Sequence, residues 1–266
     1  MDTKENLKVV VAAHEPAWVP DGEEFVPVLS GAASLQSDEA APLNWKRDDV
    51  GDNISERFSA YGDLCALYWA WKNLDADVLG FVCNGRYLAS NYRLNRKKRV
   101  AHKDFLMHRV ATYGIVVPSE TNYFVVTTAT QFAREYDELL ITVTRDVLSE
   151  ICPEYEEPFV RSLRITHGHH TNLFLMRRDL TDAYCSWLFS VLEEVEGSFA
   201  SIAPHVLENG ALCALAGLLL DPWLDVQNKR YVEISSVRVD DKATVPSSAQ
   251  YIEEQYRTKY GTKSEK

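Results

Sequence analysis

Short apolar runs and one amphipathic segment organise the first third of the chain. The runs cover residues 7–13 and 78–83 and are continuous, as in strands that are buried on both faces of a sheet. Between them, apolar side chains recur at helical spacing, at Tyr61, Leu64, Cys65, Tyr68 and Trp71. This order of strand, helix and strand predicts an α/β fold with a central, mostly parallel sheet flanked by helices.

The second half of the chain continues the alternation. We expect strands at 123–127, 173–176 and 229–234, and helices at 135–151 and 181–195. The last helix, with Asp179 or Thr181 as its cap, has an apolar face formed by Tyr184, Trp187, Leu188, Val191, Leu192 and Val195. We interpret its aromatic side chains as core rather than as stacking platforms for a ligand.

Two kinds of segment are candidates for function. Residues 21–55 are polar and lack strong periodicity, and such long loops in a compact domain are usually functional or mobile. Ligands of open α/β sheets bind beyond the carboxyl ends of the strands. His14 and residues 83–86 follow the two apolar runs directly, so we expect both at that edge.

Composition is that of one globular domain. The 266 residues are 46% hydrophobic and 25% charged, enough for a full core. We expect the domain at 1–242 and a charged tail at 243–266. The formal net charge of -11 argues against a nucleic-acid partner, because phosphates would be repelled.

Cysteine usage and hydropathy predict the compartment. The five cysteines show no paired spacing, and the first residues are charged with no apolar region of a signal peptide. These features predict a reduced, cytoplasmic protein and disfavour zinc. No apolar run reaches the roughly 20 residues that span a bilayer, the nearest being 211–220, so contact with the inner face of the membrane would be peripheral at most.

The one basic cluster, at 93–99, has two interpretations. Charge runs usually mark a solvated loop. Alternatively, the cluster lies near a ligand and contacts a diphosphate or an anionic membrane surface.

Five segments carry a family resemblance, in the family's order: 7–16, 47–55, 63–88, 122–128 and 171–189. Together they resemble bacterial glycosyltransferases of uncharacterised domain type, found in capsular and exopolysaccharide synthesis and including galactofuranosyltransferase-like members. The resemblance implies a single GT-A-like domain. It also implies transfer of a hexose from a nucleotide-diphosphate donor, a UDP-hexose, to an oligosaccharide or lipid-linked acceptor.

The chain departs from this family at three motifs, one of which is a histidine-rich stretch that reads Arg-Glu-Tyr-Asp at 134–137 here. Family members usually carry His-Tyr-Arg-Arg where this chain has Cys83-Asn-Gly-Arg, and only the last arginine is kept. They usually carry Glu-Arg where this chain has Ala216 and Gly217. The resemblance therefore leaves two alternatives: a glycosyltransferase, or a catalytically weakened or inactive relative that binds a sugar nucleotide or a protein partner.

The departing diphosphate must be stabilised by a divalent metal or by cationic side chains. The Asp-x-Asp sequence at 75–77 precedes its strand and would lie at the wrong end for a metal, so we interpret it as a turn. Residues 83–86 supply no carboxylate, which predicts a metal-independent site with Asn84 and Arg86 as ligand contacts. Arg86 either binds the diphosphate or pairs with a protein carboxylate.

The remaining site candidates are polar residues in other motifs. His14 would contact the nucleotide, and Asp49, Asp52 and Asn53 would contact ribose or sugar hydroxyls, unless they only form a turn and helix cap.

Histidines and carboxylates further along the chain complete the candidates. His169 or His170 would contact the acceptor or sugar, the alternative being turn packing. The nearest carboxylates for a general base are Asp137 and Glu138. A metal-dependent hydrolase built on residues 167–170 is a third hypothesis, with a weak spacing signal.

Overall fold

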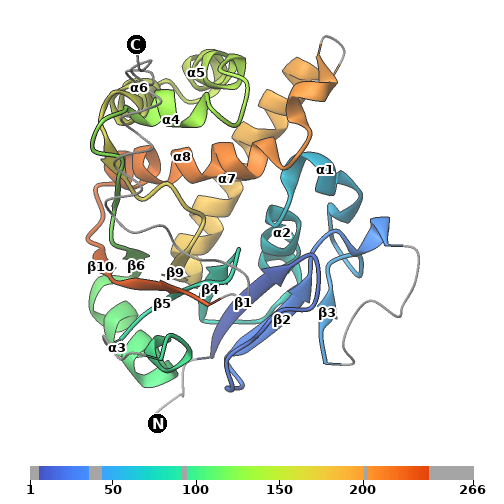
Figure 1. The fold of residues 1–266 in the computed structure, drawn as a ribbon, viewed down its shortest axis with the longest axis vertical. Coiled ribbons are helices and arrows are strands. Elements are labelled where there is room, and N and C mark those ends of the chain that lie inside the picture. The colour runs from blue at the N-terminus through green and yellow to red at the C-terminus, as the bar shows by residue number, and fades with distance from the viewer. Residues whose placement is uncertain (1–5, 36–43, 91–94, 201–202, 240–266) are drawn as a thin grey trace, which may run out of the picture.

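A seven-stranded sheet forms the centre of the molecule (Figure 1). The computed structural model describes residues 6–35, 44–90, 95–200 and 203–239. In sheet order the strands are β10 (Val232–Ile234), β6 (Ile115–Pro118), β9 (Phe174–Arg177), β4 (Val78–Val82), β1 (Leu7–Ala13), β2 (Phe25–Leu29) and β3 (Lys46–Arg47). Within this sheet only β9 runs antiparallel, to both β4 and β6. The prediction of a mostly parallel sheet is confirmed.

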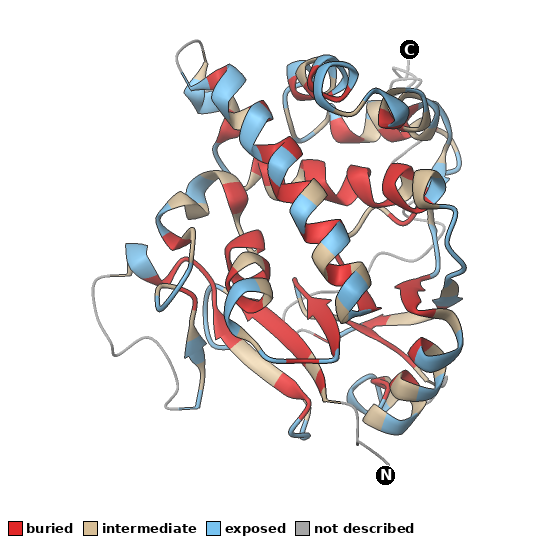
Figure 2. Cartoon of the chain, turned by 180° about the vertical axis from the view of Figure 1, so that it is seen from behind, coloured by how far each residue is buried: buried red, intermediate tan, exposed pale blue. Residues whose placement is uncertain are grey.

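Neighbouring residues of the central strands enter different cores. Val10 and Phe81 belong to one core, while Val9 and Val82 belong to a second core on the opposite face. Figure 2 shows these strands almost wholly buried. This double burial explains why the sequence runs are continuously apolar instead of alternating.

Helices cover both faces and extend the molecule beyond the sheet. The described residues form α1 (Phe58–Tyr61), α2 (Leu64–Asn73), α3 (Lys103–Tyr113), α4 (Thr128–Phe132), α5 (Leu139–Ile151), α6 (Glu156–Arg164), α7 (Arg178–Phe199) and α8 (Ala211–Gln227). Helices α2 and α7 pack on one face, and α3 packs on the other. Helices α4, α5, α6 and α8 form a second layer, joined to the sheet by the long helix α7 (Figure 1).

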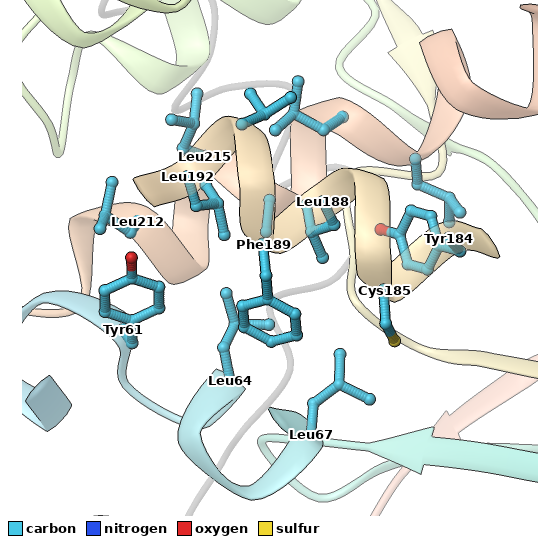
Figure 3. Close-up of a cluster of buried hydrophobic side chains, with 14 of the residues drawn as sticks. Tyr61, Leu64, Leu67, Tyr184, Cys185, Leu188, Phe189, Leu192, Leu212 and Leu215 are labelled. Atoms are coloured by element: carbon cyan, nitrogen blue, oxygen red, sulfur yellow. The ribbon is translucent and has the colours of Figure 1, made fainter. Parts of the chain in front are cut away.

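The larger core lies where α7 meets α2 and α8. Phe189 of α7 points toward Leu64 and Leu67 of α2 (Figure 3). Its ring also stacks on Trp71 with centroids 5.9 Å apart. Tyr184, from the same helix, is fully buried, which confirms the prediction that this aromatic face is core.

Two small antiparallel ribbons lie outside the main sheet. One pairs β5 (Arg86–Leu88) with β11 (Ser236–Arg238), and the other pairs β7 (Thr121–Asn122) with β8 (His167–Gly168). Each ribbon joins segments that are far apart in sequence.

The predicted strand at 123–127 is wrong. Phe124 has a positive φ of 57°, and the Thr127 side chain caps α4 by accepting a hydrogen bond from the Thr130 amide. β-branched and aromatic residues suggested a strand here, but this left-handed turn and the cap end the extended backbone. The strand that enters the sheet is β6, nearby in sequence.

Other predicted bounds need smaller corrections. Helix α5 begins at Leu139 rather than 135. The Asp137 carboxylate accepts a hydrogen bond from the Leu139 amide and so ends the preceding turn. Helix α7 has Arg177 as its N-cap, not Asp179 or Thr181. The segment 21–55 contains strands β2 and β3, which its polarity concealed. The predicted tail, 243–266, lies outside the described residues.

Candidate functional site

A cavity of about 1080 Å³ opens at the carboxyl ends of β1 and β4. Its wall is drawn from six parts of the chain, within 11–18, 58–63, 83–87, 123–136, 170–172 and 209–218, and from Arg238 and Val239. The topology gathers these parts. Strands β1 and β4 are parallel and end at this edge, and the antiparallel strand β9 begins there. This is the edge at which ligands of open α/β sheets bind.

His14 lies just beyond β1, as predicted, and lines the cavity. Its imidazole stacks on Phe58 with ring centroids 4.6 Å apart. Nδ1 donates a hydrogen bond to the Ser30 carbonyl oxygen at 3.1 Å, because a carbonyl can only accept. The ring is therefore fixed in orientation, with one edge left toward the cavity.

Asp63 is a cavity residue that sequence reasoning did not select. It lies between α1 and α2, where Gly62 breaks the helical run. Burial raises the pKa of Asp63, while the nearby His14 and the Asn84 amide act in the opposite direction. A titratable group with a perturbed pKa in a cleft is a functional candidate. The signal that could have found it is the helix break itself.

The turn after β4 presents its backbone to the cavity. Asn84 and Gly85 both line it, with φ angles of 52° and 62°. The Arg86 amide donates to the Cys83 carbonyl oxygen at 3.1 Å, which closes the turn. Two successive positive φ values are typical of Asn-Gly turns and leave no β-carbon at Gly85 to cover the backbone.

Arg86 lies opposite Arg238 in the β5–β11 ribbon, and both residues line the cavity. Arg86 Nε donates to Ser236 Oγ at 2.9 Å. The ion pairs found among the described residues include none for Arg86. Burial, and then the charge of Arg238, lower the pKa of Arg86. The alternative that Arg86 pairs with a protein carboxylate thus finds no support in the described part of the chain.

His170 lines the cavity in a constrained setting. It has a φ of 43°, and its ring stacks on Tyr123 with centroids 4.9 Å apart. Nε2 lies 3.3 Å from Thr128 Oγ1. Burial lowers the pKa of His170, so its imidazole is neutral at pH 7.

Asn172 forms part of the cavity floor and is 94% buried, its exposed fraction being 6%. Its Nδ2 donates to the Cys213 carbonyl oxygen at 2.9 Å. The amide orientation is therefore set, because only the NH₂ group can bond a carbonyl. Asn172 was not selected from sequence, since nothing local marks it as a site residue.

His169 lies behind the cavity wall and does not line it. It is almost fully buried, and its Nδ1 contacts the carboxylate of Asp221 on α8. The His169 amide donates to the other Asp221 oxygen at 3.0 Å. This pair joins the loop before β9 to α8, which is the turn-packing alternative for His169.

Asp49, Asp52 and Asn53 are not among the residues that line the cavity. Asp49 pairs with Arg47 at 2.6 Å, and Asp52 accepts a hydrogen bond from Tyr68. Asn53 Oδ1 accepts from the Ser55 amide at 3.1 Å, at the start of the next helical turn. The structure gives Asn53 the turn contact of the alternative interpretation, whereas the N-cap of the following helical turn is Ile54, without a side-chain cap.

Asp137 and Glu138 are exposed and also lie outside the cavity lining. Glu135, two residues earlier, lines it together with Gln131. The carboxylates around the cavity are thus Glu15, Asp63 and Glu135.

The three histidines of 167–170 do not converge. His167 contacts Glu120, His169 contacts Asp221, and His170 contacts Thr128. The described residues hold no cluster of three or more His, Cys, Asp or Glu side chains suited to a metal ion. The hydrolase hypothesis had these imidazoles as joint ligands, and their separate partners argue against it. Across the same residues, no helix is long and apolar enough to cross a membrane.

Comparison with known proteins agrees with this architecture. The structure superposes on a solved bifunctional glycosyltransferase, WbbM in its apo form, with a TM-score of 0.76 at 21% sequence identity. The match covers 91% of this chain but 47% of that one, so the chain spans about half of its structural neighbour. No curated protein matches the sequence. Residues 8–229 match the model of a family described as "Domain of unknown function (DUF4422)", and the chain belongs to that family.

Proposed function

We propose that the protein is a glycosyltransferase that moves a hexose from a UDP-sugar to an oligosaccharide or lipid-linked acceptor of capsular or exopolysaccharide synthesis. The observation that carries the proposal is the Arg86–Arg238 pair at the ligand edge of the sheet. The glycosyltransferase fold supports the reaction class.

The arginine pair suits a diphosphate. The two arginines are directly opposite in the β5–β11 ladder, and a bound anion would offset the repulsion between like charges there. Guanidinium groups bind phosphate oxygens in a bidentate manner. The Asn84–Gly85 turn also lines the cavity, and Gly85 leaves its backbone uncovered for a ligand to approach.

The nucleoside fits the side of the cavity nearest β1. The His14–Phe58 stack provides an aromatic surface, and the Asp63 carboxylate provides an acceptor for a base or ribose donor. Both groups come from segments adjacent to β1, whereas His170 and Glu135 come from the segments around α4 and β9. The donor would therefore extend from His14, past Arg86, toward His170.

Glu135 is the general base in this arrangement. The acceptor hydroxyl oxygen attacks the anomeric carbon of the sugar, the bond from that carbon to the diphosphate oxygen breaks, and its electron pair leaves with UDP. The hydroxyl proton passes to the Glu135 carboxylate. Glu135 takes the place predicted for Asp137 and Glu138, because it is the carboxylate of that segment that lines the cavity.

A weakened or inactive relative is the second candidate, favoured by the packing of α8. A β-carbon at Gly217 would lie 3.3 Å from the Thr171 backbone nitrogen, and Ala216 is fully buried. The Glu-Arg pair expected from the resemblance has no room here without movement of 170–171. Such a relative would bind UDP-sugars without turning them over.

The test measures UDP binding by calorimetry and sugar transfer or donor hydrolysis with a panel of UDP-hexoses. Arg86→Gln and Arg238→Gln should each weaken UDP binding at least about 10-fold, because a charge-assisted contact is lost. Arg145→Gln is the matched control, since Arg145 is exposed, pairs with Asp146 and lies outside the cavity. Absence of UDP binding by the parent would end both candidates, while binding without turnover would select the inactive relative.

A further inference from the structure

Two polar atoms of the cavity wall have no hydrogen-bond partner among the described residues: His170 Nδ1 and Asn172 Oδ1. Both atoms are buried, and both residues line the cavity. Buried polar atoms are almost always hydrogen-bonded, since an unsatisfied one costs the full desolvation of the group. Two such atoms, two residues apart on one loop, indicate a site that a ligand completes.

The role of each atom can be determined from its neighbours. Thr128 Oγ1 donates its only hydrogen to the Ile165 carbonyl oxygen at 3.1 Å, so toward His170 it can only accept. The proton of the neutral imidazole is therefore on Nε2, which lies 3.3 Å from that hydroxyl oxygen. His170 Nδ1 is left as an acceptor.

Asn172 Oδ1 is an acceptor as well. Its Nδ2 is committed to the Cys213 carbonyl oxygen. The loop thus holds two unpartnered acceptors and no free donor in these two side chains at the cavity wall. Such a pair selects a ligand that carries donors, and sugar hydroxyls are donors of that kind.

The two side chains are held firmly in place. The His170 ring lies between Tyr123 and Gly168, where an added β-carbon would approach the ring to 2.6 Å. His170 also adopts a left-handed backbone conformation that non-glycine residues rarely accept, and such conformations cluster at binding and catalytic sites. Close packing of Gly217 against 170–171 fixes the loop from the other side. A rigid pair of acceptors discriminates between ligands better than a mobile one.

We propose that His170 and Asn172 form a hydroxyl-reading subsite that accepts hydrogen bonds from one or two hydroxyl groups of the transferred hexose and so sets donor specificity. This inference rests on the proposed function and adds the residues that recognise the sugar.

The experiment removes hydroxyls from the ligand. Calorimetry on the unmodified protein compares UDP, UDP-galactose, UDP-glucose and the 2-, 3-, 4- and 6-deoxy forms of the better-bound hexose. Removal of the hydroxyl at one or two ring positions should weaken binding at least about 10-fold, because a buried acceptor is then left unpaired, while the other positions change affinity less than about twofold.

Variants then connect the positions to residues. His170→Phe keeps the ring on Tyr123 but removes Nδ1, and Asn172→Ala removes Oδ1. Each variant should lose the discrimination at one position and still bind UDP like the parent. His167→Gln is the matched control, because His167 contacts Glu120 and lies outside the cavity lining. This control should show the same differences in affinity among the deoxy forms as the parent.

Two results are decisive against the subsite. The first is equal affinity of the unmodified protein for all deoxy forms, which would overturn the subsite even if a variant fails to fold. The second is that both variants distinguish the deoxy forms as well as the parent does. In either case UDP and UDP-hexose would still bind, so the proposed function would stand. If UDP itself does not bind, the proposed function and this inference fall together.

Discussion

His169 and Asp221 form a buried ion pair that joins the loop before β9 to helix α8. Burial alone would lower the pKa of His169, but the hydrogen bond and charge of Asp221 outweigh burial and raise it. Burial would raise the pKa of Asp221, but His169 lowers it. The nearby Glu233 and Glu120 also favour the charged imidazole. The pKa of each group is thus shifted toward its charged form, and the contribution of the pair to stability depends on pH.

The first prediction follows from these two shifts. A raised histidine pKa stabilises the fold fully below the unfolded value of about 6.5, and this contribution is lost as pH rises through the folded pKa. A lowered aspartate pKa stabilises above about 3.9, and this contribution is lost as pH falls through the folded value. His169→Gln should lower the free energy of unfolding by about 3 kcal/mol near pH 5.5 and by less at pH 9. Urea unfolding at both pH values measures it, and a difference that does not depend on pH would show that the imidazole is neutral.

A second prediction separates the two cavity carboxylates. Glu135→Gln should lower the rate of sugar transfer about 10²- to 10⁴-fold and leave UDP affinity unchanged, because a base acts on the acceptor proton. Asp63→Ala should weaken UDP binding itself, because it removes the proposed acceptor for a base or ribose donor. Steady-state kinetics together with calorimetry assign each role. The reverse pattern would assign the role of general base to Asp63.

The third prediction concerns metal ions. Donor binding should persist in EDTA, because magnesium and manganese prefer oxygen ligands and the turn after β4 supplies none from carboxylates. Calorimetry of UDP binding before and after chelation, with added Mn²⁺ as the comparison, tests this. Loss of binding on chelation would require carboxylates such as Asp63 to hold a metal.

A fourth prediction concerns the loop around Asn53. Asn53→Ala should lower the free energy of unfolding by about 1 kcal/mol, because the Ser55 amide loses the side-chain acceptor of its turn. UDP affinity should change less than about twofold, since Asn53 is not among the residues that line the cavity. Melting temperature and UDP titration measure the two effects. Weakened UDP binding with normal stability would show that the loop belongs to the UDP-binding site, as the sequence motif suggested.

The sequence predicted those elements whose burial can be inferred from the apolar pattern of the element itself. Strands β1 and β4 are continuous apolar runs because both of their faces are covered, and that pattern needs no knowledge of partners. The Asn84–Gly85 turn could be placed for the same reason, as it directly follows a buried strand. Strand β2 was missed because its five residues lie within a polar segment.

The rest of the site arises from pairing across long stretches of sequence. Arg238 reaches the cavity through the β5–β11 ribbon, and Asn172 reaches it because β9 runs antiparallel to its neighbours. No local sequence pattern predicts that Arg238 and Asn172 lie at the cavity. The left-handed Phe124 has a local cause instead: its amide donates to Asn122 Oδ1, and the next amide, of Val125, donates to the Tyr123 carbonyl oxygen, which a propensity for strand does not reveal.

The β5–β11 ribbon also determines when a newly made chain can complete its cavity. Arg86 and its contact Ser236 are 150 residues apart. At translation rates of about 5–20 residues per second, β4, which ends at Val82, is synthesised roughly 8–30 s before Arg238. During that interval Arg238 is missing from the cavity, so the wall of the cavity is complete only after nearly the whole described part of the chain has been made.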